Sequence, residues 1–202
     1  IKCKDASKKF KPISVAVDAA DNIVVYCYLK GESCVRVYSQ RKHSKFEFSV
    51  VGSMSLLAGG AVAFDSNKNL VVSDDQGSRI RVVSYPDGNV IHTISIQCRP
   101  DTPRKRYIYC GGFVFDGSGH IFVANNADRS VNICDYSTGS LLQRICFRNA
   151  PGMIDDGSVC LSVAVNDKEK MLIVCCGCDV YYYPMRLIMG ADTGPLVPPT
   201  IV

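Results

Sequence analysis

The chain has 202 residues, of which 47% are hydrophobic and 21% are charged, so it can bury a sizeable core and lacks the composition of a disordered protein. Its apolar stretches are short and interrupted by Asp, Lys or Arg, which excludes the roughly 18 to 20 apolar residues of a membrane-spanning helix. The net charge of +4 is too small to identify a nucleic-acid-binding protein by itself.

The N-terminal residues and the cysteines indicate the compartment. Residues 1–11 are lysine-rich and do not begin with Met, which is unlike a signal peptide, so we expect a piece of a longer protein. The chain contains eleven cysteines, an odd number, and Cys27, Cys134, Cys146 and Cys175 fall inside predicted strands. Buried thiols behave as small hydrophobic residues, so we expect free cysteines and a reducing, cytoplasmic location.

The sequence contains a repeat of about 50 residues. The segments PISVAVD, GGAVAFD, CGGFVFD and CLSVAVN end at Asp18, Asp65, Asp116 and Asn166, with spacings of 47, 51 and 50 residues. This is the length of one four-stranded propeller blade with its loops. Each segment is expected to be the first strand of a blade.

Further strands are expected after each of these segments, separated by turns rich in Gly, Asn and Asp. The second strands are predicted at residues 23–26, 70–73, 121–124 and 172–175, the third at 35–38, 80–83, 131–134 and 180–183, and the fourth at 46–51, 90–96 and 141–147. In the last repeat only the weak stretch 187–189 could serve as a fourth strand.

The first strands are apolar on both faces. Val15 and Val17 point to one face and Ala16 to the other, and the same pattern recurs in the other three repeats. We therefore expect these strands to be buried on both sides, as the innermost strands of blades. The prediction is a single all-β domain, residues 1–202, with blades near 12–51, 60–96, 111–147 and 160–189 and a tail at 190–202. A β-sandwich built from the same hairpins is the alternative.

The repeats resemble those of NHL proteins. The chain lacks Trp, so it has no Trp-Asp dipeptide of the WD40 type, and its paired glycines precede the inner strand, unlike those of kelch repeats. The NHL pattern is matched by residues 12–18 with 22–25, by 61–74 with 79–83, and by 113–125 with 129–133.

The resemblance, which extends to the C-terminal NHL domain of TRIM-type proteins, implies a non-catalytic recognition module of a larger intracellular protein. NHL propellers usually have six blades, whereas this chain holds about four. We therefore expect that blades are missing from this sequence, that a partner chain completes the ring, or that the chain associates with itself.

In such a propeller, the loops that precede the first strands and the loops between the second and third strands would lie on the same rim. The stretch 99–109, RPDTPRKRYIY, is the densest cationic and aromatic part of that rim. Cations attract phosphates and aromatic rings stack on unpaired bases. The resemblance implies that this rim binds an RNA stem-loop or a short single-stranded RNA. A protein partner is the alternative. The stretch could also be an ordinary solvated loop that binds nothing. The candidate RNA- or partner-binding residues are Arg79, Arg99, Arg104, Lys105, Arg106, Tyr107, Tyr109, Arg129 and Arg148.

Other chemistry has weaker support. The cluster Cys175, Cys176 and Cys178 could hold zinc, but no further ligand pair is evident. Asp residues at the ends of first strands could suggest calcium, but Asx turns favour Asp there. The three histidines form no catalytic arrangement with Ser, Cys or Asp. We expect no catalysis, no metal, no cofactor and no membrane partner. A substrate-recruiting scaffold of a ubiquitin ligase without RNA binding is one alternative, and a metal-dependent lactonase- or lyase-like propeller is another.

Overall fold

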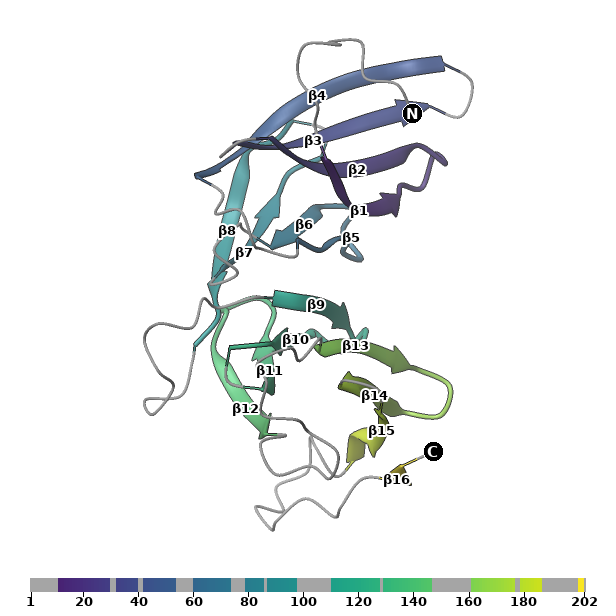
Figure 1. Ribbon diagram of the computed structural model, residues 1–202, viewed down its shortest axis with the longest axis vertical. Coiled ribbons are helices and arrows are strands. Elements are labelled where there is room, and N and C mark those ends of the chain that lie inside the picture. The colour runs from purple at the N-terminus through teal and green to yellow at the C-terminus, as the bar shows by residue number, and fades with distance from the viewer. Residues whose placement is uncertain are drawn as a thin grey trace. The chain divides into compact units, whose positions relative to one another are not determined.

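The computed structural model is all-β. It describes residues 11–29, 32–39, 42–53, 60–73, 79–85, 87–97, 110–127, 129–146, 161–176, 179–186 and 200–201. These residues form four antiparallel sheets of four strands each (Figure 1). In every sheet the strands pair in chain order, so each repeat closes its own sheet.

The strands have the following bounds. The first sheet contains β1 (Lys11–Val17), β2 (Ile23–Leu29), β3 (Glu32–Ser39) and β4 (Lys42–Ser53), and the second contains β5 (Val62–Phe64), β6 (Leu70–Ser73), β7 (Arg79–Val83) and β8 (Val90–Ser95). The third contains β9 (Cys110–Phe115), β10 (His120–Asn125), β11 (Ser130–Asp135) and β12 (Leu141–Cys146), and the fourth contains β13 (Leu161–Asn166), β14 (Met171–Cys176), β15 (Asp179–Pro184) and β16 (Thr200–Ile201).

The four repeats predicted from the sequence are confirmed as four sheets, with one correction in the last sheet. Its outer strand is β16, which the sequence prediction left in the tail, and it pairs with Tyr181 and Tyr182 of β15. The stretch 187–189, which was expected there, lies outside the described residues. A two-residue strand carries too little periodicity to be recognised in a sequence.

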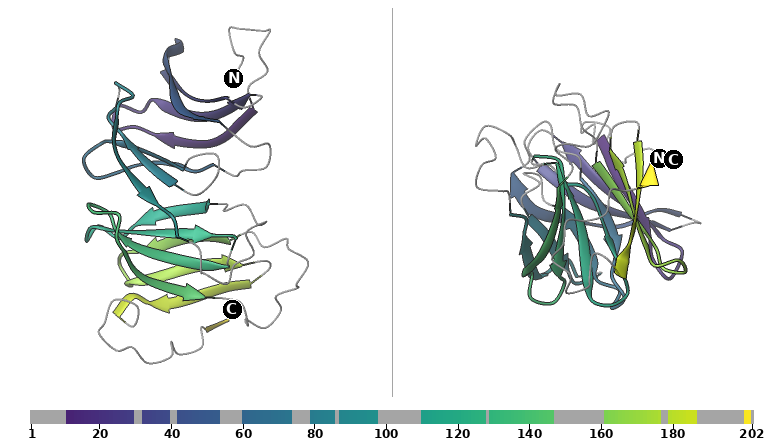
Figure 2. Two further views of the ribbon diagram at one scale, coloured as in Figure 1. Left: turned by 90° about the vertical axis from the view of Figure 1, so that its left-hand side faces the viewer. Right: turned by 90° about the horizontal axis from the view of Figure 1, so that it is seen from below.

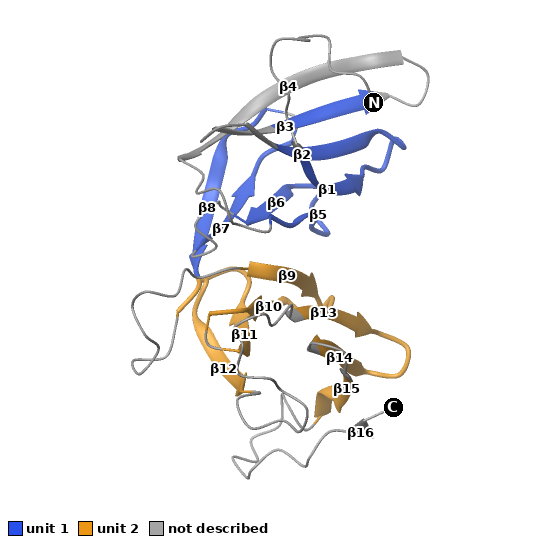
Figure 3. Ribbon diagram, viewed as in Figure 1, with its two compact units in different colours: residues 1–95 blue, residues 96–202 orange. Residues whose placement is uncertain are grey.

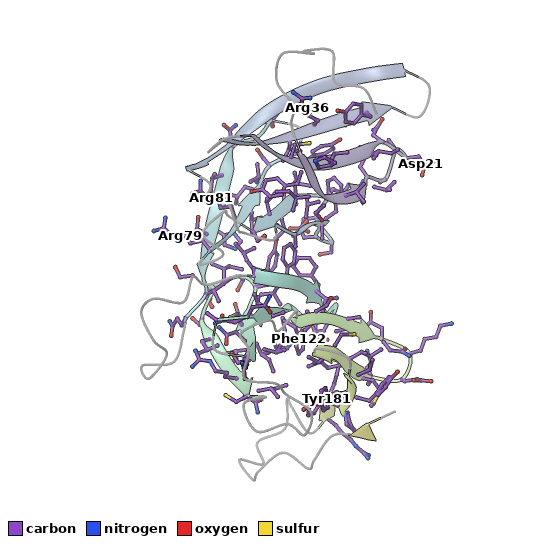
Figure 4. The ribbon with its side chains drawn as sticks, viewed as in Figure 1. Asp21, Arg36, Arg79, Arg81, Phe122 and Tyr181 are labelled. Atoms are coloured by element: carbon purple, nitrogen blue, oxygen red, sulfur yellow. The ribbon has the colours of Figure 1, made fainter. Side chains whose placement is uncertain are left out.

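The chain divides into two compact units, residues 1–95 and 96–202, each holding two sheets (Figure 3). In unit 1 the core lies between the first and second sheets and includes Val24, Tyr26 and Leu70. In unit 2 it lies between the third and fourth sheets, where Phe122 and Tyr181 are fully buried (Figure 4). Figure 2 shows the two sheets of each unit from other sides. Among the described residues no helix is long and apolar enough to cross a membrane.

The expectation that all first strands are buried on both faces is wrong for β1 and for β13, in which Ala164 is exposed. In β1, Ala16 packs against the core of unit 1, but Val15 and Val17 are 61% and 58% exposed. In the second sheet the equivalent of Val15, Val62, is only 7% exposed, because the first sheet covers it. Burial of this strand position therefore depends on a neighbouring sheet, which the local pattern cannot supply.

Candidate interaction surface

The turn between the first two strands of a sheet is built around an Asp. Asp18 Oδ1 accepts hydrogen bonds from the N–H groups of Ala20 (2.9 Å) and Asn22 (2.8 Å), and its Oδ2 accepts one from Asn22 Nδ2 (2.6 Å). Asp65 accepts equivalent bonds from the backbone and side chain of Asn69 (2.7 and 2.9 Å). The predicted Asx turns are thus confirmed, and these carboxylates are occupied by their own turns.

Tyr85 joins the turn of the first sheet to the second sheet. Its hydroxyl donates to Asp18 Oδ2 at 2.8 Å, and its ring packs edge-on against Phe64 with centroids 5.1 Å apart. Burial, the hydrogen bond to Asp18 and the charge of that carboxylate raise the pKa of Tyr85 well above 10.0. Burial alone would raise the pKa of Asp18, but hydrogen bonds from Asn22, Tyr85 and Ala20 outweigh it and hold this pKa below 3.8.

The third sheet has a histidine in this turn. His120 Nδ1 lies 2.6 Å from Asp116 Oδ2, and Asp116 Oδ1 accepts from the N–H groups of Ser118 (2.8 Å) and His120 (3.1 Å). Burial favours a higher pKa for Asp116, but the bonds from His120 and Ser118 dominate and lower it. The histidine thus stands where Asn22 and Asn69 stand in the first two sheets. Its geometry fits a turn-stabilising role.

The β13–β14 turn departs from this design. Asn166 replaces the Asp, and its Oδ1 accepts from Glu169 N at 3.2 Å while its Nδ2 donates to Glu169 Oε2 at 3.1 Å. The Met185 N–H donates to the Lys170 carbonyl at 2.8 Å, which places Arg186 close to this turn. Five exposed charged residues therefore share one surface, which we name the fourth-sheet turn cluster. It comprises Asp167, Lys168, Glu169, Lys170 and Arg186.

A second polar cluster anchors the chain that leads into the third sheet. The Gln97 carbonyl accepts from Arg144 Nη2 (2.8 Å), Asn132 Nδ2 (2.9 Å) and Asn125 Nδ2 (3.3 Å). Arg144 Nε also donates to Asn132 Oδ1 at 2.9 Å. The sequence analysis missed this cluster, although Asn132 and Arg144 interrupt predicted strands. It fixes the backbone directly before the basic stretch 99–109.

Most of the candidate binding residues lie outside the described part of the chain. This applies to Arg99, Arg104, Lys105, Arg106, Tyr107, Tyr109 and Arg148. Arg79 begins β7 and is exposed, with its side chain pointing outward (Figure 4). Arg129, which precedes β11 with a φ of 54°, is only 6% exposed. Arg79 and Arg129 belong to different units. A partner could reach Arg79 directly, whereas the burial of Arg129 leaves little of that side chain to contact.

The cysteines differ from the expectation in part. The Cys27, Cys110 and Cys134 side chains are buried, and burial raises the pKa of Cys134 to about 11. Cys146 and Cys175 are exposed, so the prediction that they replace core residues is wrong. Cys146 ends the outer strand β12, and Cys175 lies on the face of the fourth sheet that does not meet the third. The described residues contain no group of three His, Cys, Asp or Glu side chains that could hold a metal ion.

Comparison with solved structures identifies the fold. The Cps50 (Swd1) β-propeller domain of Myceliophteria thermophila has a TM-score of 0.60 at 10% identity and covers 94% of this chain. The chain is a β-propeller. The four sheets are its blades, and the fourth-sheet turn cluster belongs to the fourth blade of this propeller.

Two further structures have the same fold. BamB from Moraxella catarrhalis has a TM-score of 0.57 at 13% identity over 86% of the chain, and a protein of unknown function from Bacteroides caccae has 0.59 at 15% over 99%. The chain spans 50% to 63% of the lengths of these three structures. Neither the protein-family models nor the curated protein sequences give a match.

Proposed function

We propose that this propeller is a non-catalytic recognition domain that binds a protein partner through the fourth-sheet turn cluster. The observation that carries this is the departure of the fourth blade from the repeated turn. The first three blades close this turn with an Asp and an Asn or His, whereas the fourth closes it with Asn166 and Glu169 and places four consecutive charged residues in it, Asp167, Lys168, Glu169 and Lys170, all of them exposed. Places where a repeat breaks its own local rule are where function is expected.

The charge of the cluster favours a protein over a nucleic acid. Lys168, Lys170 and Arg186 are accompanied by Asp167 and Glu169, so the surface has both signs. A phosphate backbone selects a surface of one sign, whereas protein interfaces match mixed charges. The NHL-like sequence pattern is consistent with a recognition domain of a larger cytoplasmic protein of the TRIM type, and the share of its structural neighbours that the chain spans fits a part of a longer propeller.

The test is a comparison of binding partners between charge variants. Lys168→Glu combined with Arg186→Glu reverses the cluster without touching a buried group, and Arg79→Glu is the matched control in unit 1. Quantitative mass spectrometry of proteins retained by each immobilised variant should show a set lost only with the double variant. Loss of the same set with Arg79→Glu would place the contact in unit 1 instead, and an identical set for all three proteins would refute the proposed surface.

RNA binding is the second candidate, and the stretch 99–109 favours it. Four cations and two tyrosines occur in eleven residues there, and the anchored Gln97 carbonyl fixes the backbone before it. Fluorescence anisotropy with a random RNA pool tests it. RNA recognition requires binding at about 50 mM salt and an affinity that falls steeply as the salt concentration rises. The slope of log affinity against log salt concentration should decrease by up to about one unit for each of Arg104, Lys105 and Arg106 removed. The protein-binding proposal predicts no RNA binding.

The absence of catalysis is also part of the proposal. Asp18, Asp65 and Asp116 are held in turns, and His120 is engaged by Asp116. Metal analysis of the purified chain checks the alternative of a metal-dependent propeller enzyme. A stoichiometric bound metal would revive that alternative and refute this part of the proposal.

A further inference from the structure

Two cysteines oppose each other in the middle of the first blade. The register of β2 and β3 pairs Cys27 with Cys34, within a regular ladder that runs from Ile23 opposite Tyr38 to Leu29 opposite Glu32. Directly opposite residues of an antiparallel pair share one face of the sheet. Cys27 and Cys34 therefore occupy neighbouring positions on the same face of the first blade.

Among the strand pairs that the structure describes, this is the one place where two cysteines are opposed. The other cysteines in described strands lie opposite residues of other types: Cys110 opposite Asn125, Cys134 between Ile121 and Leu141, Cys146 opposite Ser130, Cys175 between Ser162 and Val180, and Cys176 between Leu161 and Asp179. The pair in the first blade is therefore set apart by its register, not by the abundance of cysteine in the chain.

The spacing of antiparallel strands brings such a pair within reach of a disulfide. Opposite Cα atoms are about 4.5–5.5 Å apart, and the Cα atoms of disulfides are about 4.4–6.8 Å apart. Opposite Cβ atoms are about 4.5–5.5 Å apart, whereas a disulfide brings them to about 3.5–4.5 Å. The two strands must therefore approach slightly when the bond forms, and a disulfide that distorts its surroundings in this way is more easily reduced.

The surroundings of Cys27 favour a bond within the sheet over a bond to an outside thiol. Cys27 is 3% exposed and packs with Val25 beside Ile23 and Tyr38. Its Sγ donates a hydrogen bond to the Val25 carbonyl oxygen at 3.8 Å, so the side chain is a thiol in this structure. Burial leaves little room for a bulky group on this sulfur, whereas the opposed cysteine of β3 is already inside the sheet.

We propose that Cys27 and Cys34 form a reversible disulfide that links β2 to β3 when a small-molecule disulfide such as oxidised glutathione is present. One thiolate of the pair attacks a sulfur of oxidised glutathione, and one glutathione leaves. The other thiolate then attacks the protein sulfur of this mixed disulfide and releases the second glutathione. The two protons lost by the cysteines go to the two glutathione thiolates. The first blade thereby responds to the redox state of its compartment.

Tryptic mapping of the wild-type chain tests the proposal, because trypsin cuts after Lys30, between the two cysteines. The reduced chain is equilibrated with mixtures of reduced and oxidised glutathione, and the remaining thiols are blocked with N-ethylmaleimide in denaturant. Where the exposed Cys175 carries glutathione, mass spectrometry should show peptide 31–36 joined to the peptide that ends at Lys30. Excess reduced glutathione should remove the linked pair.

The matched control moves one thiol by a single position. Ser33→Cys combined with Cys34→Ser places it opposite Tyr28, and successive residues of a strand point to opposite faces of a sheet. The yield of the linked pair should therefore fall by about tenfold or more. An unchanged yield would show that closeness in the sequence suffices, and would overturn the proposal. Wild-type Cys27 and Cys34 that stay reduced, or that bond mainly to glutathione or to other cysteines, would also overturn it.

Discussion

Leu172 tests the packing between the third and fourth blades. It is fully buried in the core that also holds Phe122 and Val174. Burying a leucine side chain is worth about 1.5–3 kcal/mol, and truncation to Ala adds the cost of the cavity, so Leu172→Ala should reduce the free energy of unfolding by about 2–5 kcal/mol. Leu142 provides the matched control, because it is 52% exposed on β12 of the same unit. Leu142→Ala should change the same quantity by less than about 0.5 kcal/mol.

Urea unfolding followed by circular dichroism measures both variants. With an m value of about 2 kcal/mol/M, Leu172→Ala should lower the urea midpoint of the unit 2 transition by about 1–2.5 M, whereas Leu142→Ala should leave it nearly unchanged. Equal shifts for the two variants would refute the reasoning, because they would mean that the two leucines have similar surroundings.

Three further predictions concern the turn, a close contact and the thiols. The pKa of Asp116 lies below 3.8 in the folded state, so its carboxylate stabilises the fold fully above that value and the contribution is lost as the pH falls through the lower folded pKa. Urea midpoints at pH 6 and pH 3 should therefore differ less for Asp116→Asn than for the wild type, and an equal difference would contradict this. Gly60→Ala would place a Cβ 2.7 Å from Cδ1 of the fully buried Tyr26, so thermal unfolding should show a loss of about 1–3 kcal/mol, and an unchanged midpoint would refute the contact. Brief alkylation of the folded chain at pH 8, read by peptide mass spectrometry, should label Cys175 and spare Cys134, whose pKa is about 11, and the reverse order would contradict the assigned exposures.

The strand order and the turns could be predicted from the sequence because both are local. The Asp at the end of the first three inner strands appears at a fixed place before an Asn or a His, and the observed hydrogen bonds span two to four residues. The apolar segments of each repeat were recognisable as strands for the same reason, because the alternation of side chains along a strand is also a local pattern. Periodicity and turn chemistry therefore identified the four blades.

The features that were missed depend on contacts between distant residues. The bonds from Asn125, Asn132 and Arg144 to the Gln97 carbonyl join residues 28 to 47 positions apart, which no local pattern encodes. Val15 is exposed because no blade among the described residues covers it. The sequence could not reveal this, because β1 has the same apolar pattern as the inner strands that are covered. The charged β13–β14 turn was visible in the sequence, but its closeness to Arg186 required the backbone bond from Met185.

Nuclear Overhauser effects between the blades of unit 2 test the central claim most directly. The account predicts cross-peaks from the methyl groups of Leu172 and Val174 on β14 to the side chains of Phe122 and Ile133 on the third blade, because all four belong to one buried cluster. Backbone cross-peaks should at the same time pair β14 only with β13 and β15. Missing contacts between the two blades, or backbone pairing of β14 with a strand of the third blade, would contradict stacked propeller blades.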